Sequence, residues 1–389
     1  MLIKQLIALI SAVAVMLLGC GQYEISDDAE NNSAIIHADS MIADVPHGNN
    51  ESVYCGYEHL NYTEQEIYNE LLEMIQQKKP EFLITDKNTD MIVKAYNTVV
   101  DDHPEFFWLN GSYSYQTTTY PDKTETVIKP AEQFNADIIG QMESELQGEV
   151  SRIVSTAQKE TNDIDKALYV HDYLVDTIEY DNDTYREISS GTGSGMIYVS
   201  STAYGGIISR KAVCSGYSAA FQLIMQRLGI PCGRASGSKA GGGNHEWNYI
   251  LLDGDFYYID VTWDDPQMVD SESDNLDNKS YDFFCVTTNE LEKTHVIDEN
   301  NFVPLCTATK YNYYVYNNLY FDTYDFIDVS GVIVSNQNAV INLKFSDENE
   351  TNKAVHDLIE KKKIFNLVSK TKVKYSIGNS KTTLKMYLE

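Results

Sequence analysis

The sequence has few basic residues, few prolines and tryptophans, and no closely spaced cysteine pair. Its 389 residues include 29 Lys and Arg against 58 Asp and Glu, which gives a formal net charge of −29. Nucleic acids require surfaces rich in Lys and Arg, so this balance argues against a nucleic-acid-binding protein. No C-x-x-C pair occurs among the six cysteines. Neither a zinc ribbon nor a thioredoxin-type site is therefore indicated.

The chain begins with the pattern of an exported protein. Lys4 precedes an apolar run, 6–18, of 13 residues, and a bilayer span needs roughly 20. The following Leu17-Leu-Gly-Cys20 resembles the bacterial lipoprotein signal, in which Cys20 is lipidated and becomes the first mature residue. The alternatives are an ordinary signal peptide or a span extended past Gly21, but polar and acidic residues follow Gly21. We therefore expect an exported protein, lipid-anchored to the outer face of the bacterial cell membrane.

Composition and periodicity divide the chain into a tether and three folded regions. The segment after Cys20 is polar and acidic with few aromatics, which is typical of a flexible tether. Beyond it, helical and alternating patterns predict an α+β protein. The predicted segments are a signal peptide (1–19), the tether (20–57), a helical region with a hairpin (58–160), a core (161–310) and a small α+β unit (311–389).

Local patterns add expectations about single elements. Thr63-Glu-Gln-Glu66 is a capping-box pattern that starts a helix. The Gly- and Ser-rich stretch 186–201 predicts a loop. Alternation predicts strands at 312–316 and 331–334. His103 precedes a proline in a turn, and we expect it at the surface.

Cys214 directly precedes a segment with helical periodicity. Apolar residues recur at helical spacing over 219–228, and Gly229 and Pro231 end the segment. Cys214 is therefore expected at or just before a helix N-terminus, where unpaired N–H groups favour a negative charge. A thiolate is the nucleophilic form of cysteine. The alternative is that Cys214 is a small buried hydrophobic residue, as most free cysteines are.

His245 and Asp260 lie on two predicted strands joined by a tight turn. Asp253-Gly254 is a strong signal for a two-residue hairpin loop. With that loop, Trp247 faces Asp260, and His245 lies on the same face as a diagonal neighbour of Asp260. A three-residue loop would place the two on opposite faces. The return strand is expected over 255–263.

The charge of Asp260 indicates that it has a partner. Its neighbours in the strand are mostly apolar, a costly environment for a carboxylate unless it is paired. Paired with His245, it would complete a nucleophile, base and orienting carboxylate with Cys214. The alternative is a surface aspartate beside a core histidine. His171 is a second candidate base, but its apolar helical surroundings favour a structural role.

At these residues the chain resembles the transglutaminase-like superfamily, within the papain-like group of cysteine enzymes. Its three motifs stand in the family's order: Lys211-Ala-Val-Cys-Ser-Gly-Tyr-Ser-Ala-Ala-Phe221 for the nucleophile helix, Gly243-Asn-His-Glu-Trp-Asn248 for the histidine strand, and Tyr258-Ile-Asp-Val-Thr-Trp-Asp-Asp-Pro266 for the aspartate strand. The resemblance covers about residues 163–266, a little over a quarter of the chain. It implies a papain/transglutaminase-like core in which the nucleophile helix packs on an antiparallel sheet.

The resemblance also implies roles for the three residues. Cys214 attacks an amide carbonyl, His245 transfers protons and Asp260 orients His245, and water or an amine resolves the thioacyl enzyme. The backbone N–H of Cys214 would form part of an oxyanion hole. Animal members of the family bind calcium. This sequence has no EF-hand loop and no dense cluster of acidic ligands, so no cofactor and no required metal are predicted.

The predicted function is a cell-surface cysteine acyl enzyme that acts on amide bonds, as a peptidase, an amidase or a protein-glutamine transglutaminase. Its partners would be peptide or protein substrates, including cell-wall peptide, and the membrane through the N-terminal lipid. One alternative is a non-catalytic lipoprotein that binds peptide or cell wall with the same fold. Another is a structural protein that links to the wall through its C-terminal unit.

Four cysteines remain besides Cys20 and Cys214. They are Cys55, Cys232, Cys285 and Cys306. Their even number and the oxidising compartment allow disulfides, with Cys285–Cys306 as the candidate pair. Four unpaired, buried thiols are the alternative.

Overall fold

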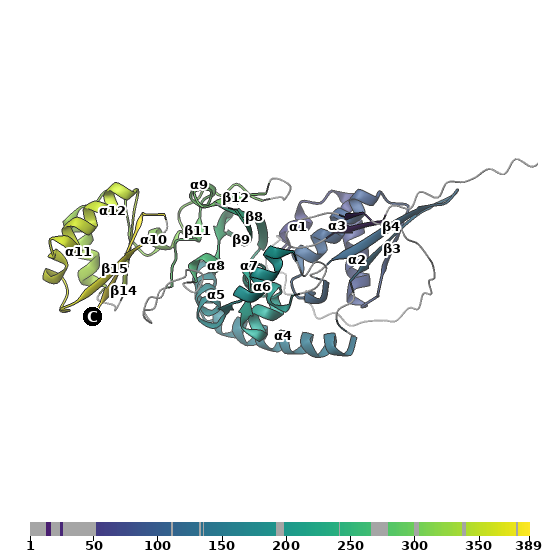
Figure 1. Ribbon diagram of the computed structural model, residues 1–389, viewed down its shortest axis with the longest axis horizontal. Helices are drawn as coiled ribbons and strands as arrows, with labels where there is room; N and C mark the ends of the chain where they lie inside the picture. The colour runs from purple at the N-terminus through teal and green to yellow at the C-terminus, as the bar shows by residue number, and fades with distance from the viewer. Residues whose placement is uncertain are drawn as a thin grey trace, which may run out of the picture.

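The computed structural model describes residues 13–16, 24–25, 52–109, 112–131, 134, 136–191, 198–240, 242–265, 279–298, 303–336, 340–378 and 380–389. Helices and mostly antiparallel sheets follow one another in three regions along an elongated molecule (Figure 1). The predicted α+β class is confirmed. None of the helices in these ranges combines the length and apolar character of a membrane-spanning segment. Cys20 and most of the predicted tether lie outside the described residues, and the predicted domain boundaries stay predictions.

The first region packs helices beside a sheet whose strand order is β2-β1-β4-β5-β3. Its elements are α1 (Cys55–Glu58), α2 (Tyr62–Gln76), β3 (Phe82–Thr85), α3 (Thr89–Asp102), η1 (Phe107–Leu109), β4 (Tyr113–Thr119) and β5 (Thr124–Pro130), with β1 (Val13–Met16) beside β4 and β2 (Glu24–Ile25) beside β1. β1 lies within the predicted signal peptide, so removal of residues 1–19 would leave β4 at the sheet edge.

Two expectations for this region are wrong. The capping box of α2 is built by Asn61 and Glu64 instead of Thr63: each of the two side chains accepts the other residue's backbone N–H. Asparagine is as good an N-cap as serine or threonine, and here it comes two residues earlier. His103 is 4 % exposed, because its ring stacks on Phe106 and its Nδ1 lies 3.2 Å from Glu105.

The central region places a helix on a five-stranded sheet of order β11-β10-β9-β8-β12. Its helical elements are α4 (Ala136–Ala157), α5 (Asp163–Thr177), α6 (Asn182–Ser190), η2 (Val199–Ser201), η3 (Gly205–Ser209), α7 (Cys214–Arg227), α8 (Val261–Asp264) and α9 (Thr288–Leu291). Its strands are β6 (Glu179–Tyr180), β7 (Lys211–Ala212), β8 (Cys232–Lys239), β9 (Asn244–Leu252), β10 (Asp255–Ile259), β11 (Phe284–Val286) and β12 (His295–Ile297). The predicted loop over 186–201 is wrong at its start, because α6 extends to Ser190.

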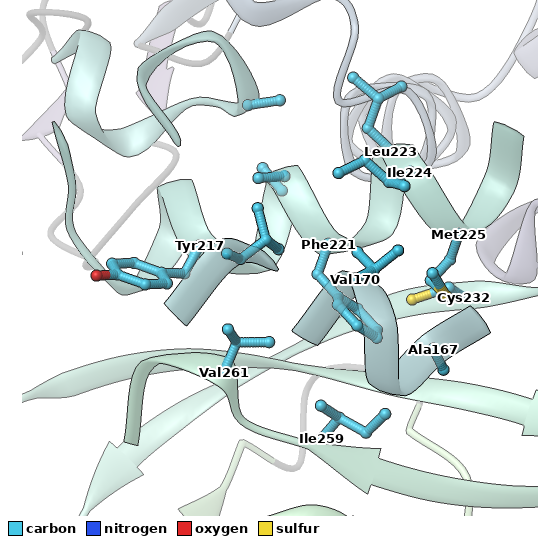
Figure 2. Close-up of a cluster of buried hydrophobic side chains, with 14 of the residues drawn as sticks. Ala167, Val170, Tyr217, Phe221, Leu223, Ile224, Met225, Cys232, Ile259 and Val261 are labelled. Atoms are coloured by element: carbon cyan, nitrogen blue, oxygen red, sulfur yellow. The ribbon is translucent and has the colours of Figure 1, made fainter. Parts of the chain in front are cut away.

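Helix α7 is buried along most of its length. Phe221 and Ile224 are fully buried and share one apolar cluster with Val170 of α5 and Ile259 of β10. Figure 2 shows Phe221 between α7 and the strand that carries Ile259, and Ile224 on the other side of α7. Burial of such side chains stabilises a fold by roughly 1.5–3 kcal/mol each. The same packing fixes the position of the first turn of α7, where Cys214 lies.

The C-terminal region combines helices with a sheet of order β13-β14-β16-β15. Its elements are α10 (Tyr313–Tyr316), β13 (Tyr320–Phe321), α11 (Phe326–Ser335), β14 (Val340–Phe345), α12 (Glu348–Val355), η5 (His356–Glu360), η6 (Lys363–Asn366), β15 (Val373–Ile377) and β16 (Thr383–Leu388). The strands predicted at 312–316 and 331–334 are wrong, since both segments are helical. Asn312 and Asp325 cap α10 and α11 with their side chains, and these caps outweigh the β-branched and aromatic composition.

Candidate active site

Cys214 is the first residue of α7. The chain enters the helix from β7, which pairs with β6, and the N-cap residue Val213 is extended. No side chain caps this helix, so its first N–H groups and the positive end of its dipole lie beside the thiol. Cys214 is half-buried, whereas the other four cysteines in the described part of the chain are buried. The described cysteine with access to a reagent or substrate is therefore Cys214.

The hairpin that carries the other two residues has the predicted two-residue loop. Asp253 and Gly254 both adopt positive φ, as a type I′ turn requires. The pairing runs from Asp255–Leu252 to Ile259–Asn248, and the same register continued would pair Asp260 with Trp247.

The return strand is shorter than predicted. It ends at Ile259, because Asp260 becomes the N-cap of α8 and accepts the N–H of Trp263 on Oδ1 at 3.1 Å. The facing of the side chains is nevertheless as predicted, since Asp260 Oδ2 meets the ring of His245.

His245 and Asp260 form a short, buried hydrogen bond. Nε2 of His245 lies 2.6 Å from Oδ2 of Asp260, and the two residues are 5 % and 0 % exposed. Because a carboxylate only accepts, the proton of this bond is on Nε2. Nδ1 is then the ring nitrogen left for Cys214. The alternative of a surface aspartate beside a core histidine is wrong, because both residues are buried and bonded.

The charges of this pair support each other. Burial alone would lower the pKa of His245, but the Asp260 carboxylate and then Cys214, by side-chain hydrogen bonding and charge, raise it to about 10. Burial would raise the pKa of Asp260, but His245 and His295 hold it well below its ordinary value. At neutral pH the site therefore favours an imidazolium next to a carboxylate. An imidazolium beside a cysteine stabilises the thiolate form.

His295 is a residue of the site that the sequence pattern did not indicate. It lies on β12, and its Nε2 is 3.0 Å from the same Oδ2 of Asp260 that His245 contacts. The segment around it carries no motif of fixed spacing, and β12 reaches the site only through its pairing with β8.

The cluster of two histidines and one aspartate also has the donor set of a metal site. Ligand atoms of His245, Asp260 and His295 lie within 4.8 Å of one another, and this group is the only one of its kind in the described part of the chain. Two imidazoles and a carboxylate suit Zn²⁺ or another first-row divalent cation. In the structure Nε2 of each histidine is hydrogen-bonded to Oδ2 of Asp260.

Two further candidates from the sequence, His171 and the Cys285–Cys306 pair, are buried in the protein interior. His171 is fully buried, with Nε2 3.2 Å from Asp264 and Nδ1 3.1 Å from Asp172, which agrees with the structural alternative. The suggested Cys285–Cys306 disulfide is wrong, because both thiols are free.

Comparison with known proteins finds a family match in the central region. The family model of the transglutaminase-like superfamily matches residues 151–261. These residues form a transglutaminase-like core. The match contains Cys214, His245 and Asp260, and it agrees with the resemblance over 163–266.

Three solved structures are similar to this chain. A TGase is 16% identical over 43% of this chain and 47% of its own, with a TM-score of 0.29. A candidate cysteine protease from Cytophaga hutchinsonii is 15% identical over 38% and 61%, with a TM-score of 0.25. A candidate protease from Parabacteroides distasonis is 11% identical over 36% and 34%, with a TM-score of 0.20. The chain thus spans less than two thirds of each of these structures. No curated protein matches it.

Proposed function

We propose that this protein is a cysteine acyl enzyme that attacks amide bonds of peptides or proteins. One observation carries the proposal: a half-buried Cys214 opens helix α7, and the buried His245–Asp260 pair, joined at 2.6 Å, interacts with it. The transglutaminase-like core supports the same reaction class. The sequence adds the proposal of a cell-surface location, with a lipid on Cys20.

The acylation step follows from the protonation of this group. The Cys214 thiolate attacks the amide carbonyl carbon, and the carbonyl oxygen becomes an oxyanion near the first N–H groups of α7. The His245 imidazolium then gives its proton to the amide nitrogen, the carbon–nitrogen bond breaks, and the amine leaves. The product is a thioester on Cys214 and a neutral His245.

Deacylation reverses these roles. His245 takes a proton from water or from an amine as that molecule attacks the thioester. The carbon–sulfur bond breaks and Cys214 leaves as a thiolate, which restores the ion pair with His245. Water yields a peptidase or amidase, and an amine yields a transglutaminase. Throughout, Asp260 holds His245 with Nε2 protonated and stabilises its positive charge.

Substrate trials with a matched variant test the proposal. The mature protein and Cys214→Ser would be incubated with glutamine-containing and cell-wall peptides, with and without a fluorescent primary amine. We expect an acyl adduct on Cys214 by mass spectrometry, followed by hydrolysis or amine incorporation, and neither in Cys214→Ser. Binding of the peptides without adduct or product would instead show a non-catalytic binding protein.

A further inference from the structure

Asp260 is held by three hydrogen-bond donors, and of these only His245 has a part in the reaction derived above. Oδ1 accepts the N–H of Trp263. Oδ2 accepts from Nε2 of His245 at 2.6 Å and from Nε2 of His295 at 3.0 Å. A carboxylate with three donors from three different segments has little freedom to turn. His295 supplies the donor that lies farthest from Cys214 in the sequence.

The ring of His295 is itself fixed at both nitrogens. Its Nδ1 lies 2.9 Å from the hydroxyl of Thr294, which also contacts the carbonyl oxygen of Leu291 at 3.2 Å. The ring packs against Trp263 and Phe283, with centroid distances of 4.5 and 5.3 Å. His295 is 1 % exposed. A ring held in this way presents Nε2 to Asp260 in one orientation.

The backbone brings β12 unusually close to β8, the strand that separates it from the histidine strand β9. Gly237 of β8 pairs with His245 on one side and with Ile297 of β12 on the other. A Cβ on Gly237 would lie 2.0 Å from the carbonyl oxygen of Val296. Only glycine therefore allows this approach, which sets His295 and His245 on the same carboxylate oxygen.

We propose that His295 is a positioning residue: its Nε2–H fixes Oδ2 of Asp260 at the place where that oxygen orients His245 toward Cys214. The inference rests on the proposed function of Cys214 and His245. It assigns His295 no contact with substrate. The titratable groups that interact with Asp260 include His245, His295 and, by charge, the Tyr180 hydroxyl.

Two substitutions separate this role from simple packing. His295→Phe keeps an aromatic ring between Trp263 and Phe283 but removes the donor. His295→Gln loses the ring but keeps an N–H donor near the position of Nε2. If His295 positions Asp260, Cys214 should react faster in the Gln variant than in the Phe variant. If His295 acts only by packing, the order of the two rates should be reversed.

The readout is the iodoacetamide labelling rate of Cys214 at neutral pH, in EDTA, on protein shown to be folded by thermal unfolding. We expect His295→Phe to label at least tenfold more slowly than the wild type, and His295→Gln to stay within about threefold of it. The downfield proton NMR signal of the His245–Asp260 bond should be lost in the first variant and kept in the second.

Equal or faster labelling of His295→Phe would overturn the inference, as would a Gln variant no better than the Phe variant. A change of the wild-type rate on adding EDTA would also overturn it, because a metal would then hold the cluster. Failure of the proposed function gives a different result: Cys214 of the wild type would then be labelled no faster than Cys214 of His245→Ala.

Discussion

Gly216, two residues after Cys214, is the position where one added methyl group tests the placement of the nucleophile. A Cβ at this position would lie 2.3 Å from the carbonyl oxygen of Ser200 and 2.8 Å from Cβ of Ala212. The Ser200 oxygen cannot move away freely, since it accepts the N–H of Val213 at 2.9 Å. Carbon–oxygen contacts are ordinarily about 3.3 Å or longer, so the first turn of α7 must shift by roughly 1 Å.

The expected magnitude follows from two opposing effects of Gly216→Ala. Overpacking costs about 1–3 kcal/mol, and the higher helix propensity of alanine returns about 1 kcal/mol. We expect a net loss of about 1 kcal/mol in the free energy of unfolding. A displacement of about 1 Å can lower the rate of a positioned reaction on the order of 100-fold, so labelling of Cys214 by iodoacetamide should slow by tenfold or more.

Gly148→Ala in helix α4 is the matched control. Gly148 is exposed, and an added Cβ meets no atom within 4 Å. Gly148→Ala should raise the free energy of unfolding by up to about 1 kcal/mol and leave the labelling rate of Cys214 unchanged. Chemical denaturation and the labelling rate would be measured for both variants. Equal changes in the stability of the two variants would refute the reasoning, as would labelling of Gly216→Ala at the rate of the wild type.

Three further predictions concern buried charges and one helix cap. Asp260→Asn breaks a buried pair and should lower the free energy of unfolding by about 3–5 kcal/mol. Because the pKa of His245 is raised to about 10, the stability of the wild type should also fall as pH rises from about 6.5 toward 10. Denaturation curves of the variant should not show this decline. His171→Leu should cost a similar amount but leave Cys214 labelling intact in the folded protein, whereas loss of labelling would identify His171 as the base. Asn61→Ala should cost about 1 kcal/mol in thermal unfolding, and Thr63→Ala less than about 0.5 kcal/mol; the reverse order would contradict the observed cap.

The hairpin and the nucleophile helix were predictable because local chemistry specifies them. Asp253-Gly254 determines the loop length, the loop length determines the register, and the register places Asp260 on the face of His245. Gly229, with φ of 79°, ends α7 as expected. Each of these inferences uses interactions between residues close in sequence, or a parity rule with two outcomes.

The rest depended on contacts between distant segments. His295 reaches Asp260 through strand β12, which pairs with a part of β8 that lies more than 50 residues earlier in the chain. This strand carries no motif of its own. The segments of α10 and α11 have a composition typical of strands but are helical. Their N-cap residues, Asn312 and Asp325, and a buried face determine the structure of such short segments. His103 is buried by the docking of neighbouring aromatic rings, which its position before a proline does not reveal.

The most direct test of the account is the iodoacetamide labelling of the protein at graded pH, compared with His245→Ala and read by mass spectrometry. Cys214 is the half-buried cysteine of the described residues, and burial raises the pKa of the Cys55, Cys232, Cys285 and Cys306 thiols. We expect Cys214 of the folded wild type to react selectively and fast even near pH 6, where ordinary thiols with a pKa of about 8.5 react slowly, and to lose that advantage in His245→Ala. Equal rates in the two proteins, or no preference for Cys214, would contradict an activated cysteine–histidine pair.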